Sequence, residues 1–216
     1  MPPILLHLLL LLSGYLLGSI PSGWLAGRWL AGIDLRREGS GSTGATNVLR
    51  LVGRGPALVV LMVDVLKGTV AVVLARTALS GTAAAATSAG WQLDAWVVAA
   101  GLAALAGHIW PVWLGGRGGK AVATGLGMLL GLAWPVALAC LGVFLAVLGL
   151  SRIVSLSSVA AALALPLLML LWTRNEPRPA YLALAVIAAA MVVWRHRGNL
   201  QRLVEGSEPR LGERRG

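Results

Sequence analysis

Long apolar stretches alternate with short polar segments along the 216 residues of this chain. A membrane-spanning helix needs about 20 mostly apolar residues, so each long stretch is a candidate span. The stretches that fit one span each are residues 4–31, 56–79, 94–113, 153–172 and 180–194. The pattern predicts an all-α integral membrane protein with one polytopic domain over residues 1–216 and no separate soluble domain.

The apolar stretch from Ala121 to Leu150 is too long for one upright span and short for two. Its 30 residues would rise about 45 Å as a single helix, whereas the hydrocarbon core of a bilayer is about 30 Å thick. Pro135 lies near its middle, after a glycine-rich half. We therefore predict two short transmembrane helices, 121–133 and 135–150, joined by a turn at Trp134–Pro135, and seven transmembrane helices in total.

The basic residues support seven crossings. Arg and Lys concentrate at residues 28–54, around Arg117 and in the tail that begins at Arg195, whereas the loop 80–93 has none. Lys and Arg favour cytoplasmic segments, and two crossings through 121–150 put all three basic segments on one side. The sequence therefore predicts an N-terminus outside and a C-terminus in the cytoplasm.

The composition agrees with a membrane protein. Hydrophobic residues make up 57% of the chain and charged residues only 12%, against about 25% charged residues in a soluble domain. This excludes an ordinary soluble enzyme, and the single cysteine, Cys140, excludes an intramolecular disulfide. The net charge is +10, and most of the basic residues that produce it lie in short segments between apolar stretches. This placement indicates anionic lipids or an anionic substrate as partners and no nucleic acid.

The first polar segment, residues 36–50, is rich in glycine and short hydrogen-bond donors. Gly39, Gly41 and Gly44 let backbone N–H groups approach an anion closely. Their G-x-G-x-x-G spacing does not indicate a dinucleotide site, because a membrane helix and not a strand precedes it. A plain polar loop explains the segment equally well. Its candidate anion-binding residues are Ser40, Asn47 and Arg50.

The second polar segment contains four glycines around Arg117, and Lys120 follows where the next helix begins. Backbone donors at a helix N-terminus, together with two cations, form a site for an anion. The alternative is a tight turn with cytoplasmic charges. Because four glycines exceed the need of a turn, we favour a phosphate site at Gly118, Gly119 and Lys120.

The third polar segment follows the last span. His196 and Asn199 are three residues apart and share a face of a helix. His196 is a candidate base, hydrogen-bond donor to a phosphate, or metal ligand. The alternative for this segment is a basic helix end that binds lipid head groups. Elsewhere, Ser155 is a candidate helix cap or phosphate ligand. Asp64 and Lys67, inside the second span, predict a structural ion pair.

Taken together, these segments resemble the bacterial acyl-phosphate:glycerol-3-phosphate acyltransferase family, over nearly the whole chain. The segments that carry the resemblance are residues 14–21, 39–50, 64–68, 107–112, 118–124, 195–199 and 205–206. The resemblance implies a seven-helix enzyme of the bacterial inner membrane, with its active site on the cytoplasmic face. It also implies transfer of a fatty acyl group from acyl phosphate to the 1-hydroxyl of glycerol 3-phosphate. The products would be lysophosphatidic acid and phosphate, in the first step of phospholipid synthesis.

The family's functional residues match this sequence one at a time. Substrate-binding positions match Ser40, Arg50, Gly118, Gly119 and Lys120, and catalytic positions match Ser155, His196 and Asn199, with Glu205 just after them. Two positions depart from the family pattern. Ser42 stands where Asn is usual, and Ala121 replaces the usual Gly after the loop lysine. Ala121 would be strained if that position needs a positive φ.

The implied chemistry needs two anion sites, because both substrates carry a phosphate. An acyl phosphate is already activated, so the main demands are positioning and charge stabilisation. Either His196 or the phosphate of glycerol 3-phosphate, with a second pKa of about 6, takes the hydroxyl proton. We favour the phosphate, with His196 and Asn199 holding the substrate. No cofactor and no metal site is predicted.

The predicted partners are glycerol 3-phosphate, acyl phosphate and membrane lipids, with the enzyme that forms the acyl phosphate as a candidate protein partner. A transporter of small phosphorylated metabolites is the alternative function. Transporters place their substrate sites near the bilayer midplane, often between repeats, whereas here the polar groups gather at one face. A lipid-binding scaffold is a third hypothesis, and it would need only the basic charge.

Overall fold

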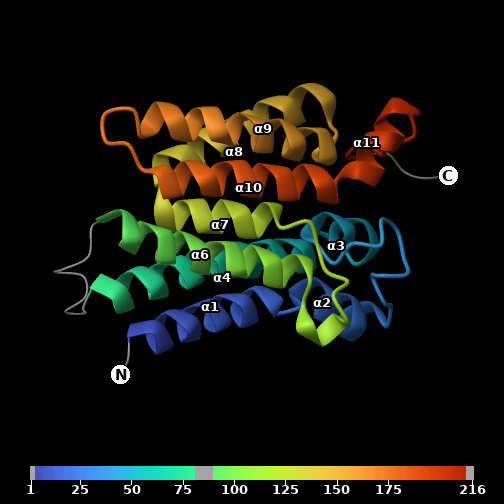
Figure 1. The fold of residues 1–216 in the computed structure, drawn as a ribbon. Coiled ribbons are helices and arrows are strands. Elements are labelled where there is room, and N and C mark those ends of the chain that lie inside the picture. Colours follow the sequence, from blue (N-terminus) through green and yellow to red (C-terminus); the bar gives the residue numbers. More distant parts are fainter. Residues whose placement is uncertain (1–2, 81–89, 213–216) are drawn as a thin grey trace. The chain divides into compact units, whose positions relative to one another are not determined.

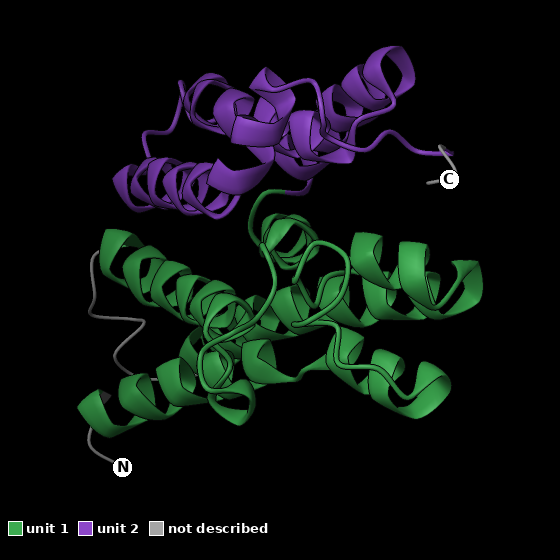
Figure 2. Cartoon of the chain, turned by 90° about the vertical axis from the view of Figure 1, so that its right-hand side faces the viewer, with its two compact units in different colours: residues 1–133 green, residues 134–216 purple. Residues whose placement is uncertain are grey.

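The structure, a computed structural model, describes residues 3–80 and 90–212. Every regular element within these ranges is a helix, so the predicted all-α architecture is confirmed. The chain forms two compact units, Met1–Ala133 and Trp134–Gly216 (Figure 2), and a single domain over residues 1–216 stays a prediction. Most of the loop predicted at 80–93 and the end of the basic tail lie outside the described residues.

Unit 1 is built around one long helix, α4 (Arg54–Ser80). The other elements are α1 (Pro3–Ser19), α2 (Ser22–Ala31), α3 (Ala45–Leu51), α6 (Gly90–Ile109), the 3-10 turn η1 (Val112–Leu114) and α7 (Val122–Leu132). Helix α4 packs against α1, α6 and α7, which Figure 1 shows side by side with α4 behind them. Gly68 of α4 lies against the backbone of α7, and Gly127 of α7 lies against the backbone of α4. Such close approach through glycine is typical of membrane helix pairs.

The first predicted span, 4–31, is divided into two helices. Helix α1 ends at Ser19 and α2 begins at Ser22, because Pro21 has no N–H for a helical hydrogen bond. The carbonyl oxygen of Ile20 at this break accepts a hydrogen bond from Nζ of Lys67, at 3.2 Å. The two helices together still have the length and hydropathy of one membrane span.

Unit 2 contains α8 (Trp134–Ser151), α9 (Val154–Trp172), α10 (Pro179–Arg195) and α11 (Arg197–Val204). Helix α9 packs against α8, α10 and α11. The predicted division of 121–150 into two helices is present, with the break at Ala133 and not at Trp134–Pro135. Pro135 lies in the first turn of α8, where a missing N–H costs no helical hydrogen bond.

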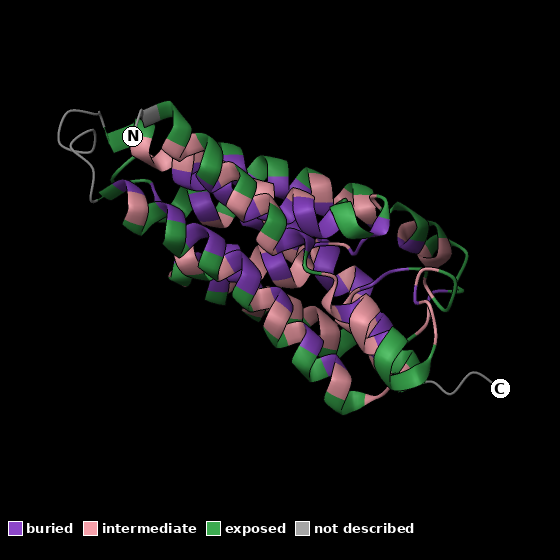
Figure 3. Cartoon of the chain, turned by 90° about the horizontal axis from the view of Figure 1, so that it is seen from below, coloured by how far each residue is buried: buried purple, intermediate pink, exposed green. Residues whose placement is uncertain are grey.

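The described residues contain five helices, or helix pairs, long and apolar enough to cross a membrane. The number is six if α10 and α11, bent by 56°, count as one span. Helix α7 has 11 residues and is shorter than the others that were predicted to span. Large apolar side chains such as Leu58, Leu66 and Leu163 lie exposed on these helices. Exposed and buried residues follow one another along the same helices (Figure 3), as expected where an outer face contacts lipid.

Candidate active site

Asn47 organises the first polar loop. This buried side chain lies in the first turn of α3, and its Nδ2 donates to the carbonyl oxygens of Ser42 at 2.9 Å and Glu38 at 3.1 Å. Its Oδ1 accepts from the backbone N–H of Ser40 at 3.1 Å. The carbonyl oxygen of residue 42, and not its side chain, makes the bond, so the Ser42 departure leaves this contact intact. Asn47 thus shapes the loop that carries Ser40, and the substrate contact predicted for it stays a prediction.

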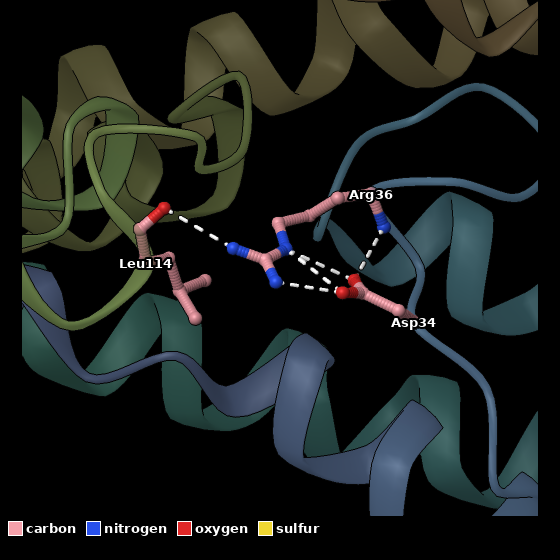
Figure 4. A network of polar contacts seen from close by, with 3 residues as sticks. All are labelled: Asp34, Arg36 and Leu114. Atoms are coloured by element: carbon pink, nitrogen blue, oxygen red, sulfur yellow. Dashed lines mark hydrogen bonds and ion pairs between the residues drawn. The ribbon is translucent and has the colours of Figure 1, made fainter.

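Asp34 and Arg36 connect the first loop to the turn before the second one. Arg36 Nη2 lies 2.6 Å from Asp34 Oδ2, and Arg36 Nη1 donates to the carbonyl oxygen of Leu114 at 3.2 Å (Figure 4). The hydrogen bonds between the two side chains lower the pKa of Asp34 to about 2 and raise the pKa of Arg36. Both groups therefore stay charged at neutral pH, and the two loops of unit 1 are held together.

The second loop returns against the last turn of α6. The backbone N–H groups of Gly118 and Gly119 donate to the carbonyl oxygens of Ile109 and His108, at 3.1 and 3.0 Å. From the sequence, these two N–H groups were predicted to lie in a phosphate site, and in the structure both donate to backbone carbonyls of the protein. The glycines are needed because a Cβ at Gly118 would overlap the backbone of α6, and one at Gly119 would overlap the ring of His108.

Lys120 and Ala121 follow at the start of α7. Lys120 is half-buried, and Ala121 precedes the first helical residue, Val122. Ala121 has φ 60° and ψ 16°, so the position does adopt the left-handed conformation in which a side chain is strained. The N-terminal turn of a helix presents N–H groups without intrahelical partners, and Lys120 stands beside that turn.

A buried polar cluster lies beneath the second loop. Asp64 Oδ1 accepts from Ser22 Oγ at 2.6 Å and lies 2.8 Å from Nζ of Lys67. Nδ1 of His108 is 3.7 Å from the same oxygen. The predicted ion pair of Asp64 and Lys67 is therefore confirmed, and the structure adds Ser22 and His108 to it.

The polar centre of unit 2 is Glu208. Its Oε1 accepts from Ser155 Oγ at 2.8 Å and from Asn199 Nδ2 at 2.6 Å, and its Oε2 accepts from Nε of Arg202 at 2.9 Å. Burial raises the pKa of Glu208, but the hydrogen bonds from Asn199 and Ser155 and the charge of Arg202 outweigh it and lower the pKa. The carboxylate is therefore ionised and acts only as an acceptor.

Glu208 is the acidic residue brought to Asn199, whereas the substrate-binding role that the sequence predicted for Glu205 stays a prediction. Glu205 is exposed and accepts from Nε2 of Gln201 at 3.0 Å. After α11 the chain reverses at Gly206, which has φ 71°, and the N–H of Glu208 donates to the carbonyl of Arg202. A glycine just past a helix end is the usual signal for such a reversal, so the sequence did contain a clue to Glu208.

His196 lies just before α11, with a buried ring. Its Nδ1 lies 2.8 Å from the carbonyl oxygen of Val192. Since a carbonyl only accepts, Nδ1 carries the hydrogen, and Nε2 is the basic nitrogen of the neutral ring. The backbone N–H of Asn199 donates to the carbonyl of His196 at 2.8 Å, which places the two predicted residues one helical turn apart.

The predicted site residues fall into two sets, one in each unit. Unit 1 holds Ser40, Asn47, Arg50, Gly118, Gly119 and Lys120, and unit 2 holds Ser155, His196, Asn199 and Glu205. Arg50 lies exposed in the last turn of α3. Within the described ranges, no group of three or more His, Cys, Asp or Glu side chains is arranged to hold a metal ion.

The sequence model of the glycerol-3-phosphate acyltransferase family matches residues 8–206. The chain belongs to this family. The resemblance stated from the sequence segments is therefore confirmed. Among the relatives, a glycerol-3-phosphate acyltransferase of Prochlorococcus marinus (strain MIT 9313) is 68% identical over 96% of each chain. One of Synechococcus sp. (strain CC9902) is 64% identical over 98% of each chain.

Solved structures of this acyltransferase family are also similar. The crystal structure of PlsY, an integral membrane glycerol 3-phosphate acyltransferase, in its glycerol 3-phosphate form has a TM-score of 0.81 and 36% identity. That match covers 95% of this chain and 96% of PlsY. The lysophosphatidic acid form of the same enzyme has a TM-score of 0.78 and 35% identity, over 95% of both chains. Together with its apolar helices, this likeness shows that the chain is an integral membrane protein.

Proposed function

We propose that this chain transfers a fatty acyl group from acyl phosphate to the 1-hydroxyl of glycerol 3-phosphate. The observation that carries the proposal is the likeness, over nearly the full length, to a membrane acyltransferase solved in a glycerol 3-phosphate form and a lysophosphatidic acid form. The acceptor and the product of the proposed reaction correspond to these two forms. Acyl phosphate as the donor rests on the family resemblance of the sequence segments.

In the proposed step, the 1-hydroxyl oxygen of glycerol 3-phosphate attacks the acyl carbonyl carbon. A new ester C–O bond forms, and the bond between the acyl carbon and the phosphate oxygen breaks, so that phosphate leaves with the electron pair. The hydroxyl proton passes to the phosphate of glycerol 3-phosphate, whose second pKa is about 6. No covalent acyl-enzyme is needed, because the donor is already activated.

The two sets of residues suit different parts of the substrates. Arg50 and Lys120 supply cationic donors, which bind phosphate. In unit 2, the hydroxyl hydrogen of Ser155 and an amide hydrogen of Asn199 are directed to the ionised Glu208. These groups thus present oxygen acceptors beside a negative charge, which favours a hydroxyl over a phosphate. We therefore assign phosphate recognition to the loops of unit 1 and hydroxyl recognition to Ser155 and Asn199.

His196 is the alternative proton acceptor, because Nδ1 donates to Val192 and leaves Nε2 as the basic nitrogen. The pH–rate profiles of the wild type and His196→Ala distinguish the two bases. We expect the variant to be strongly impaired in substrate binding while its residual activity follows the same titration near neutrality. A variant that keeps appreciable activity but loses that titrating step would show that His196 is the base.

We further propose seven crossings, an outer N-terminus, a cytoplasmic C-terminus and an active site on the cytoplasmic face of the bacterial inner membrane. The break at Ala133 and the basic segments support this topology. Helix α7, whose 11 residues rise about 16 Å, would cross as a short helix supported by its packing on α4.

Cysteine labelling tests the topology. Single cysteines at Ser80, Glu176 and Arg210, in a Cys140→Ala background, are treated in spheroplasts with a membrane-impermeant maleimide. We expect labelling at Ser80 and Glu176 and none at Arg210 until the membrane is opened. The reverse labelling of Glu176 and Arg210 would show that 121–150 crosses once.

The activity is tested with purified protein supplied with glycerol 3-phosphate and either palmitoyl phosphate or palmitoyl-CoA. We expect lysophosphatidic acid and phosphate in equal amounts from the acyl phosphate alone. Lys120→Ala should abolish product formation in a folded protein, whereas Arg37→Ala, at an exposed arginine of the first loop, is the matched control. Absence of product from folded wild type, with uptake of glycerol 3-phosphate into vesicles, would instead support the transporter alternative.

A further inference from the structure

The buried cluster around Asp64 has no part in the chemistry described so far. The side chains of Asp64 and Lys67 are 1% and 3% exposed. Ionisable residues inside a membrane protein are costly and are retained where they have a specific task. The ion pair compensates both charges, yet it does not explain why His108 turns Nδ1 toward Asp64, 3.7 Å from Oδ1.

His108 is in direct contact with the second loop. A Cβ at Gly119 would overlap Nε2, Cε1 and Cδ2 of the His108 ring, so the loop backbone lies against the Nε2 edge of that ring. The carbonyl oxygen of His108 also accepts from the N–H of Gly119 at 3.0 Å. The ring therefore has Asp64 on its Nδ1 side and Gly119 on its Nε2 side, and Lys120 is the next residue.

We propose that His108 is a positioning residue for the segment Gly118–Lys120, with Asp64 orienting its ring. The ring fixes how closely the loop approaches α6 and thereby where the Lys120 ammonium is presented. This inference rests on the proposed function, in which Lys120 binds a substrate phosphate. It assigns to the cluster a role in substrate affinity, beyond that of an ion pair between helices.

A rescue experiment tests the contact. In Gly119→Ala the new methyl group has no room beside the ring, and His108→Ala removes the ring. Each single variant should raise KM for one phosphorylated substrate by about tenfold, the size of coupling expected for residues in contact, with kcat changed far less. In the double variant the space vacated by the ring accepts the methyl group, so KM should stay at the about tenfold higher value of His108→Ala and not reach the about hundredfold rise that additive effects would give.

Several readouts keep the test decisive. The stabilisation of each variant by glycerol 3-phosphate and by inorganic phosphate in a thermal-shift assay reports binding without turnover. His7→Ala is the control, because His7 stacks on Trp96 in a separate contact and should keep the wild-type KM. If Gly119→Ala fails to fold, recovery of folding in the double variant supports the contact equally.

The proposal is overturned if His108→Ala keeps the wild-type KM for both substrates, or if the effects of the two substitutions simply add. It is also overturned if the variants lose only thermal stability, with KM and ligand stabilisation unchanged. Failure of the proposed function would appear differently, as inactive wild-type protein in the same preparation.

Discussion

In the part of the chain that the structure describes, each unit contains one buried carboxylate with a similar set of donors. Asp64 in unit 1 accepts a hydrogen bond from the Ser22 hydroxyl and forms an ion pair with the Lys67 ammonium. Glu208 in unit 2 accepts hydrogen bonds from the Ser155 hydroxyl, the Asn199 amide and the Arg202 guanidinium. The surroundings differ: Lys67 is 3% exposed inside an apolar helix, whereas Arg202 is 38% exposed at the end of a short one.

This difference separates two uses of the same chemistry. The contacts of Asp64 with Ser22 and Lys67 join α2 and α4, so their loss should mainly affect folding, and the effect on substrate affinity that we propose for this cluster passes through His108 alone. The Glu208 cluster orients Ser155 and Asn199, two residues with proposed substrate contacts, so its loss should mainly affect activity. Similar hydrogen-bond patterns around a carboxylate therefore do not by themselves distinguish a structural cluster from a functional one.

The largest effect is expected from Asp64→Asn. It leaves the Lys67 ammonium buried without its counter-charge, which costs about 3–5 kcal/mol of unfolding free energy. Denaturation of the protein in detergent, or its yield in the membrane, measures the loss. The control is Asp64→Asn combined with Lys67→Met, which removes both charges and should restore most of the stability. No recovery in the double variant would show that the ion pair is not the main contribution.

Glu208→Gln should have the next largest effect. It removes the ion pair with Arg202 and loosens Ser155 and Asn199, so we expect kcat/KM to fall by more than tenfold and the unfolding free energy by about 1–3 kcal/mol. Glu205→Gln, at the exposed acid three residues earlier, is the matched control and should behave as wild type. Equal losses in both variants would contradict the geometry.

The same variant has a pH signature. Because the pKa of Glu208 is lowered in the folded protein from 4.5, its contribution to stability is fully present above that value. The contribution is lost as the pH falls through the lower folded pKa. Wild type should therefore lose its advantage over Glu208→Gln only in acid, which unfolding measured from pH 7 to pH 3 would reveal.

The two serines give a matched pair with smaller effects. Ser22→Ala and Ser155→Ala each remove one hydroxyl donor from a carboxylate, a loss of about 1–2 kcal/mol. We expect Ser22→Ala to lower the melting temperature with KM unchanged, and Ser155→Ala to raise KM for glycerol 3-phosphate. A kinetic effect of the Ser22 variant as large as that of the Ser155 variant would remove the distinction between the clusters.

The smallest effect concerns two of the residues with a left-handed backbone, Ala121 in unit 1 and Gly206 in unit 2, with φ 60° and 71°. Ala121→Gly relieves strain of about 1–2 kcal/mol but removes a buried methyl group, at a cost of about 0.8 kcal/mol. We expect a net gain of less than about 1 kcal/mol, seen as a slightly higher melting temperature. Gly206→Ala should shift it in the opposite direction.

The local pattern of apolar and polar residues was enough to predict much of the fold. Apolar stretches predicted most helices, and Pro135 with the preceding glycines marked the break near Ala133. The division at Pro21 was missed because the stretch is apolar on both sides of it. Hydropathy averages over such a stretch and does not detect one missing N–H.

The site was predicted less completely, for a physical reason. His196 and Asn199 lie within one turn of helix, so their spacing in the sequence reflects their distance in space. Glu208 acquires its partner Ser155 only because the chain reverses after α11, and Arg36 reaches Leu114 across 78 positions. Such contacts depend on tertiary packing, which local spacing does not encode.

The hydrogen bond between Lys67 and the carbonyl of Ile20 has an evolutionary consequence. That carbonyl is accessible because the helix is interrupted at Pro21, so the interruption and the lysine depend on each other. A lineage that lost Pro21 would tend to lose Lys67 as well, and Asp64 with it. These positions should therefore change together among relatives, although Pro21 lies more than 40 residues before the other two along the chain.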